Sequence, residues 1–189
     1  MSVQLVREIA SEAFKDAIEM LSIIETLEAG NAPDVIAAVN SAKTGAVVQY
    51  INAALWSRLL LIVTRAYAAS RIGDRHAQHA FDLLGDPVVR SAVEKTGRLP
   101  STLTEAVALW MQCRGDHRRQ SIHDYRDKQI AHWGTQKHSS PIINDIFAVT
   151  RATATALERL AQGTGVVSLS VESQLVGYRD DAKRFWGAQ

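Results

Sequence analysis

The chain has little of what marks secreted or disulfide-linked proteins. It contains one cysteine, Cys113, so no internal disulfide can form and a reducing compartment is expected. Its first twenty residues lack the apolar core of a signal peptide, since their charges are spread through an amphipathic pattern. Aromatic residues make up 6% of the chain and the formal net charge is +1, so no global attraction to nucleic acid exists. These features predict a soluble, cytoplasmic protein.

Several catalytic signatures are also absent. The sequence has no glycine-rich phosphate loop, no GxSxG elbow and no HExxH motif. It has no paired acidic residues at metal-ligand spacing, which argues against a metal-dependent nuclease. We therefore expect no metal and no cofactor. The most apolar stretch, residues 46–69, is interrupted by polar residues that include Arg58 and Arg65, so it predicts a buried helix rather than a membrane span.

Apolar residues recur at helical spacing along most of the chain. The pattern predicts a first helix over residues 3–29 and a second over 34–63, apolar on most sides, that forms the central core element. Whether Gly45 breaks this second helix is left open, because one glycine costs only about 1 kcal/mol. A further amphipathic helix runs from Pro141 to Gly163. The fold class is all-α: a helical bundle of four long helices plus short accessory helices.

Shorter signals complete this arrangement. Asp86 before Pro87 predicts a capped helix, and Thr102 with Glu105 resembles a capping box that starts another. Residues 166–171 alternate in polarity, which favours a short strand or an extended segment. We expect one domain over residues 1–189, with 171–189 forming a helix that docks on the bundle. The side chains expected to dock are Leu175, Val176, Phe185 and Trp186.

The stretch 112–129 has almost no apolar stripe. Gly115 is expected to kink or split it, and Asp116 to cap the polar part. Arginine grips phosphate with two parallel hydrogen bonds, and histidine exchanges protons near neutral pH, so their concentration here indicates phosphate chemistry or phosphate binding. The residues expected to contact phosphate are Arg119, His123 and Lys128. We interpret the stretch as a charged helix held at its two ends; the alternative is a solvated outer helix.

Two other sets of residues stand out. Arg58 and Arg65 share a helix face and reach either a pocket or interface, or a rim position with the charged head in water. Two residue pairs have spacings that suit zinc, which would make the chain a metal-bound regulator, although nothing in the sequence brings the pairs together. The pairs are His76 with His79, and Cys113 with His117. The alternative is that these are ordinary polar and packing residues.

The stretch RDKQIAH carries a resemblance. Arg126 is followed by the polar Asp127 and, after five intervening residues, by His132. This arrangement resembles the signature of the HEPN superfamily, the higher eukaryotes and prokaryotes nucleotide-binding domains. With Ala131 before the histidine, the motif sequence is most similar to that of the AbiU-like abortive-infection branch.

The resemblance implies a homodimer whose two motifs form a composite, metal-independent ribonuclease site, with RNA as substrate and an antitoxin or other protein as partner. Arg126 would hold the scissile phosphate, His132 would act as general acid or base, and Asp127 would orient one of them. In an α-helix, at 100° per residue, six positions place Arg126 and His132 on different faces, so they converge only if the helix ends first or a second chain contributes. Gly134 stands where some relatives carry a modified tyrosine, so that regulation is not implied.

A second interpretation remains open. Many HEPN domains are inactive modules, and the arginine can be a structural residue paired with an acid such as Asp124 or Asp127. The chain would then be a non-catalytic helical dimer that binds a nucleotide, RNA or protein through the same patch.

Overall fold

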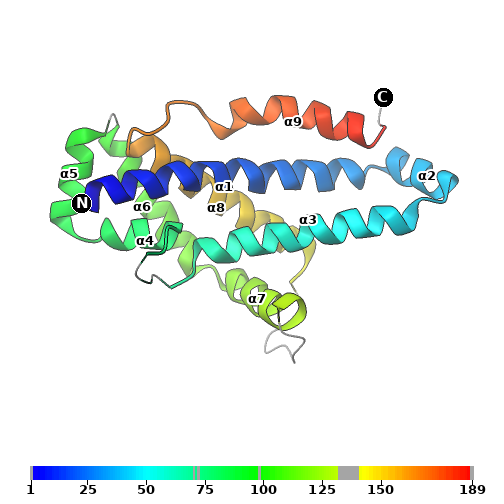
Figure 1. Cartoon of the computed structure of the whole chain (residues 1–189), viewed down its shortest axis with the longest axis horizontal. Coiled ribbons are helices and arrows are strands. Elements are labelled where there is room, and N and C mark those ends of the chain that lie inside the picture. Colours follow the sequence, from blue (N-terminus) through cyan, green and yellow to red (C-terminus); the bar gives the residue numbers. More distant parts are fainter. Residues whose placement is uncertain (1, 70, 72, 98, 132–140, 188–189) are drawn as a thin grey trace.

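The computed structural model describes residues 2–69, 71, 73–97, 99–131 and 141–187. Within these residues all regular structure is helical (Figure 1), which confirms the all-α prediction. The elements are α1 (Ser2–Gly30), α2 (Pro33–Ala42), α3 (Gly45–Ala66), α4 (Ala77–Leu83), α5 (Pro87–Thr96), α6 (Pro100–Gly115), α7 (His117–Tyr125), the π-helix η1 (Arg126–Ala131), α8 (Ile143–Gly163) and α9 (Val171–Phe185). The alternating segment at 166–171 forms no strand; it leads into α9.

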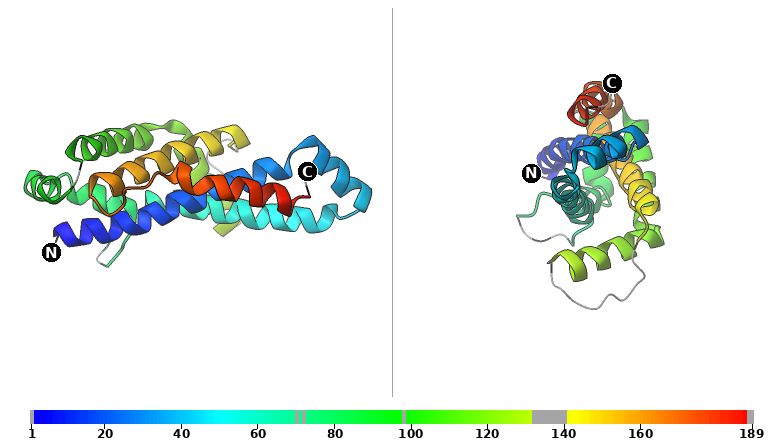
Figure 2. Two further views of the ribbon diagram at one scale, coloured as in Figure 1. Left: turned by 90° about the horizontal axis from the view of Figure 1, so that it is seen from above. Right: turned by 90° about the vertical axis from the view of Figure 1, so that its right-hand side faces the viewer.

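The core lies around α1, which matches the helix predicted at 3–29. Figures 1 and 2 show α1 running along the molecule, with α3 and α9 beside it. Its apolar stripe is buried from Val6 to Leu27 and packs on α8, which in turn packs on α6. Trp110 of α6, 1% exposed, is stacked against the rings of Tyr67 and Phe81 at centroid distances of 4.5 and 4.4 Å. Burial of these long stripes is the main stabilising contribution to the bundle.

The single helix predicted over 34–63 is two helices. The break falls at Lys43, whose φ of 56° is left-handed and whose N–H bonds to the carbonyl of Asn40. A left-handed residue closes a helix C-terminus by satisfying its last carbonyls. Gly45 is then the first residue of α3, so the interruption lies just before the glycine.

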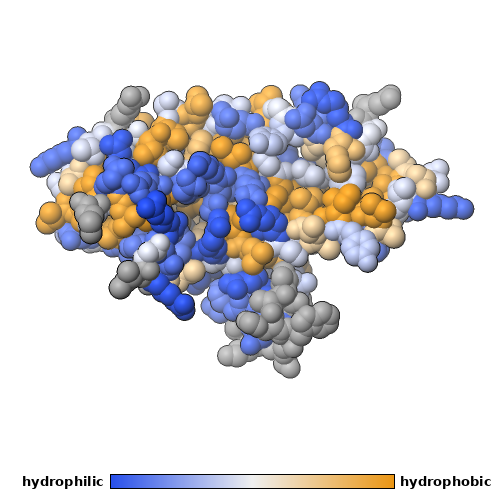
Figure 3. Space-filling view, in the orientation of Figure 1, coloured by the Kyte–Doolittle hydropathy of each residue, from blue (hydrophilic) through white to orange (hydrophobic). Residues whose placement is uncertain are grey.

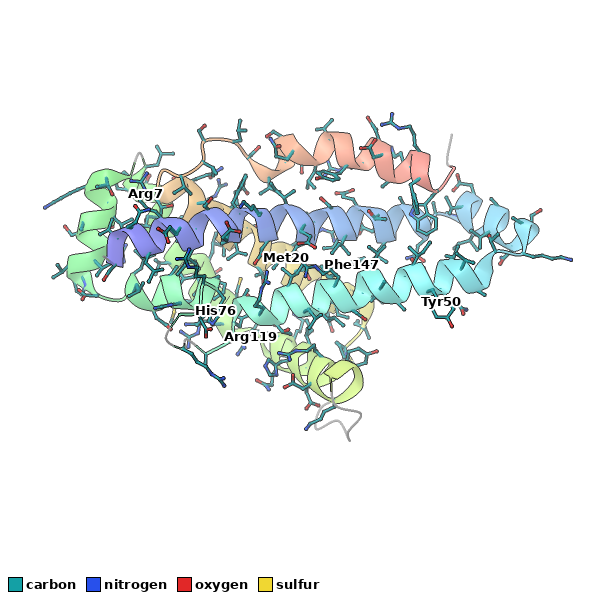
Figure 4. The ribbon with its side chains drawn as sticks, in the orientation of Figure 1. Arg7, Met20, Tyr50, His76, Arg119 and Phe147 are labelled. Carbon is teal, nitrogen blue, oxygen red and sulfur yellow. The ribbon has the colours of Figure 1, made fainter. Side chains whose placement is uncertain are left out.

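The prediction that this region forms the central core was wrong. The buried side chains of α3 all lie in its C-terminal half, between Leu59 and Ala66, and α2 buries Val35, whereas Val47 and Tyr50 are 60% and 80% exposed. Figure 4 shows Tyr50 projecting away from α3, and Figure 3 shows apolar side chains along this part of the surface. In the described part of the chain, α3 alone is long and apolar enough to cross a membrane. Its C-terminal half is nevertheless built into the helical core.

Of two helix starts predicted from capping residues, one was confirmed and the other was wrong. Asp86 caps α5 as predicted, with its carboxylate accepting the N–H of Val88 at 2.8 Å. The capping box at Thr102 was wrong, because α6 already begins at Pro100 and has no side-chain cap. Proline is pre-organised for the first helical turn, so the helix begins three residues earlier than a cap at Thr102 would give.

The C-terminal helix α9 packs along α1. Leu175 is buried, and the Trp186 indole donates to the carbonyl of Thr26 at 2.9 Å. Its ring covers Gly30, where an added Cβ would lie 2.8 Å from the ring. The docking predicted for Val176 and Phe185 was wrong, since they are 59% and 62% exposed. They lie on the outer face of a helix that has only one side on the bundle.

Candidate functional site

The polar stretch 112–129 is divided at Gly115 and Asp116, as the sequence predicted. α6 ends at Gly115, and the Asp116 carboxylate caps α7 by accepting the N–H of Arg118 at 2.9 Å. The Arg118 guanidinium also binds this carboxylate at 2.7 Å. These hydrogen bonds hold the pKa of Asp116 below its ordinary value. The start of α7 is thereby fixed.

α7 lies against α3 at the edge of the bundle, as the end-on view in Figure 2 shows. Ile122, in the middle of α7, is fully buried, and the Arg119 guanidinium lies 5.1 Å from the centroid of the Tyr67 ring. The helix is therefore held along its length. This corrects both the interpretation of a helix held only at its ends and the alternative of a solvated helix.

After Tyr125 the helix widens into η1, a π-helix that contains Arg126 and Asp127. Such π-segments are rare and are often found at functional sites. The predicted separation of Arg126 and His132 onto different faces stays a prediction, because it depends on a residue that follows η1. His132 itself, with Gly134, lies outside the described residues.

Arg126 is fixed from two sides. Its Nε donates to the Thr64 hydroxyl on α3 at 3.1 Å, and its Nη1 lies 2.8 Å from Oδ1 of Asp127. The Thr64 hydroxyl donates to the carbonyl of Leu60 at 2.7 Å, so its lone pairs are free to accept from the arginine. With 24% of its side chain exposed, Arg126 keeps part of its guanidinium accessible.

Asp127 joins Arg126 to a histidine. Its second oxygen, Oδ2, lies 3.2 Å from Nδ1 of His123, one turn earlier. The carboxylate therefore contacts two of the residues predicted for the site. A carboxylate at Nδ1 favours the proton on that nitrogen and leaves Nε2 as the acceptor.

Arg126 lines a pocket of 370 Å³ together with two arginines of α3. We call this the arginine pocket; its lining residues are Arg58, Leu61, Ile62, Thr64, Arg65, Ala68 and Arg126. Arg58 and Arg65 lie in the wall of this pocket. Of the two positions considered for them, a pocket and a solvent-exposed rim, the structure shows the pocket. Nothing in the sequence connects them with Arg126. The available signal was their seven-residue spacing, which places two arginines on one face of α3.

Each α3 arginine is held by a carboxylate of α1. Arg58 donates to both oxygens of Glu19 at 2.6 and 2.8 Å, and Arg65 to both oxygens of Asp16 at 2.7 and 2.9 Å. The hydrogen bond from Arg58 lowers the pKa of Glu19. Burial raises the pKa of Asp16, which outweighs the opposite effect of Arg65. Any anion that enters must therefore share these arginines with bound carboxylates.

The other predicted residues lie apart from this pocket. Arg119 and Lys128 are half-buried, and neither belongs to its lining. Cys113 is buried, and His79 bonds through Nδ1 to the carbonyl of Asp74 at 2.9 Å. Across the ranges that the structure describes, no three potential metal ligands come together. The two pairs that suggested zinc thus do not form a joint site in this region.

The fold and the site together define an all-helical protein with an arginine-containing motif at a π-helical turn. Comparison with protein families matches the chain to the AbiU2 family of HEPN domains over residues 4–185. The chain therefore belongs to this family, which confirms the resemblance drawn from residues 126–132. Comparisons with curated proteins and with solved structures gave no match.

Proposed function

We propose that this protein is a metal-independent endoribonuclease of defence or toxin type, acting in the cytoplasm as a homodimer with a composite site. The observation that carries the proposal is the convergence of Arg126 with Arg58 and Arg65 on one pocket. Each of the three guanidinium groups already binds a carboxylate, and its remaining N–H groups are the donors that would bind phosphate oxygens. Membership of a HEPN family supports the same chemistry.

The proposed reaction is attack by a ribose 2'-hydroxyl on the adjacent phosphorus. A base removes the 2'-proton, the bond from phosphorus to the 5'-oxygen breaks, and an acid protonates that oxygen. The products are a 2',3'-cyclic phosphate and a 5'-hydroxyl. His132 serves as general acid or base. Arg126 stabilises the charge on phosphorus, and because it is already held in place, little reorganisation is needed during the reaction.

Asp127 has the orienting role in this scheme. It contacts Arg126 at 2.8 Å and His123 at 3.2 Å, so one carboxylate positions both a phosphate-binding and a proton-exchanging side chain. Two protomers would each bring such a set to the composite site. An antitoxin or other protein partner would restrain the cleavage.

One observation favours a second function. Arg126 already has partners within its own chain, Thr64 and Asp127, so it fits a structural role as well. The protein would then be a non-catalytic dimer that binds a nucleotide, RNA or a protein through the arginine pocket.

Cleavage of a mixed RNA pool in EDTA separates the two functions. We expect the unaltered protein to leave 2',3'-cyclic phosphate ends, and His132→Ala to lose about 10²-fold or more in rate, the usual contribution of a general acid or base. His117→Ala is the matched control, because the His117 side chain is 93% exposed and lies outside the arginine pocket. Sedimentation of both variants checks that the dimer persists.

The outcomes are distinct. Cyclic ends that disappear in His132→Ala and persist in His117→Ala support the ribonuclease. Absence of cleavage across a range of RNAs and protein concentrations, or full activity of His132→Ala, refutes it and leaves the binding module.

A further inference from the structure

A second pocket, of 570 Å³, adjoins the arginine pocket. We call it the adjoining pocket; its lining residues are Glu12, Asp16, Arg65, Ala68, Ala69, Arg71, Asp74, Arg75 and His76. Arg65 and Ala68 line both pockets, so the two form one continuous surface past the C-terminal end of α3. Figure 3 shows hydrophilic side chains gathered over this part of α1 and α3.

The adjoining pocket contains cations that are available to a ligand. Within the described residues Arg75 makes one ion pair, with Glu8 at 3.1 Å, and its side chain is 62% exposed. The Arg71 guanidinium has no ion pair with any residue in the described ranges. With Arg65 these side chains surround the space between α1 and the segment before α4. A phosphate entering from the arginine pocket meets Arg65 first.

His76 lines this pocket with a nearly buried imidazole ring. Its side chain is only 10% exposed, and its Nε2 lies 3.3 Å from Oδ2 of Asp74. Its Nδ1 has almost no accessible surface and no hydrogen-bond partner among the described residues, so it does not itself contact a ligand in the open pocket. A buried nitrogen without a partner costs free energy of folding. Figure 4 shows His76 near the C-terminal end of α3.

The opposite wall is acidic. Glu12 and Asp16 stand one turn apart on α1, so both carboxylates face the same side. Asp16 is held by Arg65, whereas Glu12 is 55% exposed and, among the described residues, pairs with Nζ of Lys15 at 2.8 Å. An ionised carboxylate only accepts hydrogen bonds. It therefore favours a ligand edge that carries N–H groups.

We infer that the adjoining pocket binds the nucleotide next to the scissile phosphate, with its phosphate on Arg65 and Arg71 and its base edge toward Glu12. The inference rests on the proposed function for the identity of that phosphate. Cytosine presents an exocyclic amino group where uracil presents a carbonyl, and a carboxylate accepts from the amino group. Uracil offers only its N3–H, which lies between two carbonyl oxygens that repel a carboxylate, so the pocket prefers bases with an exocyclic amino group over uracil. Phosphate contacts alone carry no such preference.

Binding of 2'-O-methyl tetranucleotides tests this without requiring cleavage, because their 2'-oxygens have no proton and cannot attack. Fluorescence anisotropy at fixed salt compares oligo(C) with oligo(U), two pyrimidines that differ at the group in question. We expect oligo(C) to bind the full chain about fivefold to tenfold more tightly, which corresponds to one good hydrogen-bonding contact. Glu12→Gln should bring the two affinities together, since the amide both donates and accepts.

Arg71→Ala should weaken both oligonucleotides by a similar factor. The controls are Glu28→Gln and Arg151→Ala, which remove the two halves of an ion pair that lines neither of the two pockets. Equal affinity of the unaltered protein for oligo(C) and oligo(U), or unchanged binding by Glu12→Gln and Arg71→Ala, overturns the inference. Base-dependent binding in a protein that cleaves no RNA overturns the ribonuclease and retains the pocket as a nucleotide site.

Discussion

Removing the hydrogen bond between Arg126 and Thr64 should change both the free energy of unfolding and the rate of RNA cleavage. Thr64 is 3% exposed, and its hydroxyl accepts from Nε of Arg126 at 3.1 Å. Thr64→Val keeps the shape of the side chain but removes this acceptor. It also removes the bond that the hydroxyl donates to the carbonyl of Leu60 at 2.7 Å.

The expected magnitude follows from the exposure of Arg126. A hydrogen bond to a charged group contributes about 1.5–3 kcal/mol. Since the Arg126 side chain is 24% exposed, water replaces part of the lost bond, and we expect a decrease of about 1–2 kcal/mol in the free energy of unfolding. That corresponds to a fall in Tm of about 2–8 °C for a chain of this size. RNA cleavage should fall about tenfold, because the guanidinium loses one of its two anchors.

Thr150→Val is the matched control. Thr150 is fully buried, and its hydroxyl donates to the carbonyl of Ile146 at 2.7 Å, so this variant loses the same kind of bond to the preceding turn. The difference between the two variants in urea unfolding isolates the contact with Arg126. Thr64→Ser should retain most of the stability. If Thr64→Val and Thr150→Val lose equal stability and cleave RNA equally, the anchoring role of Thr64 is refuted.

Two further predictions concern the packing and the cap that position the site. Gly163→Ala should lower the free energy of unfolding by about 1–3 kcal/mol in urea unfolding, because a Cβ there would lie 2.6 Å from the backbone nitrogen of Leu103. A variant as stable as the unaltered chain would contradict the close crossing of α6 and α8. Asp116, whose pKa is lowered by Arg118, adds stability that is present above its ordinary value of 3.8 and is lost as pH falls through the folded-state pKa. Asp116→Asn keeps the cap but loses the charge, so it should be about 1 kcal/mol less stable than the unaltered chain at pH 7, and this difference should shrink as pH falls below 3.8. A difference that stays constant as pH falls would exclude the charge as the cause.

The sequence was sufficient for features that depend on neighbouring residues. The helical periodicity of residues 3–29 predicted α1, and the caps at Asp86 and Asp116 act as their positions indicated. The few residues from Arg126 to His132 were enough to indicate the family, which the match over 4–185 confirms. Each of these signals is local, because periodicity, capping and a short motif involve residues within a turn or two of one another.

The sequence misled where burial depended on distant partners. The stretch 46–66 is apolar on most sides, yet the first half of α3 extends beyond the helices that cover its second half. Val176 and Phe185 are apolar but lie on the outer side of α9. Apolar character raises the tendency to be buried without specifying which face has a neighbour.

The sequence by itself determined an all-α chain, the extents of α1 and α8 to within a few residues, the cap at Asp116 and the motif that begins at Arg126. Only the tertiary structure decided that Arg58 and Arg65, more than sixty residues earlier, share a pocket with Arg126, and that Asp16 and Glu19 hold them there. The physical reason is that ion pairs between helices depend on how the helices cross and rotate. That geometry is set by the packing of whole apolar faces, which no single stretch of the chain contains.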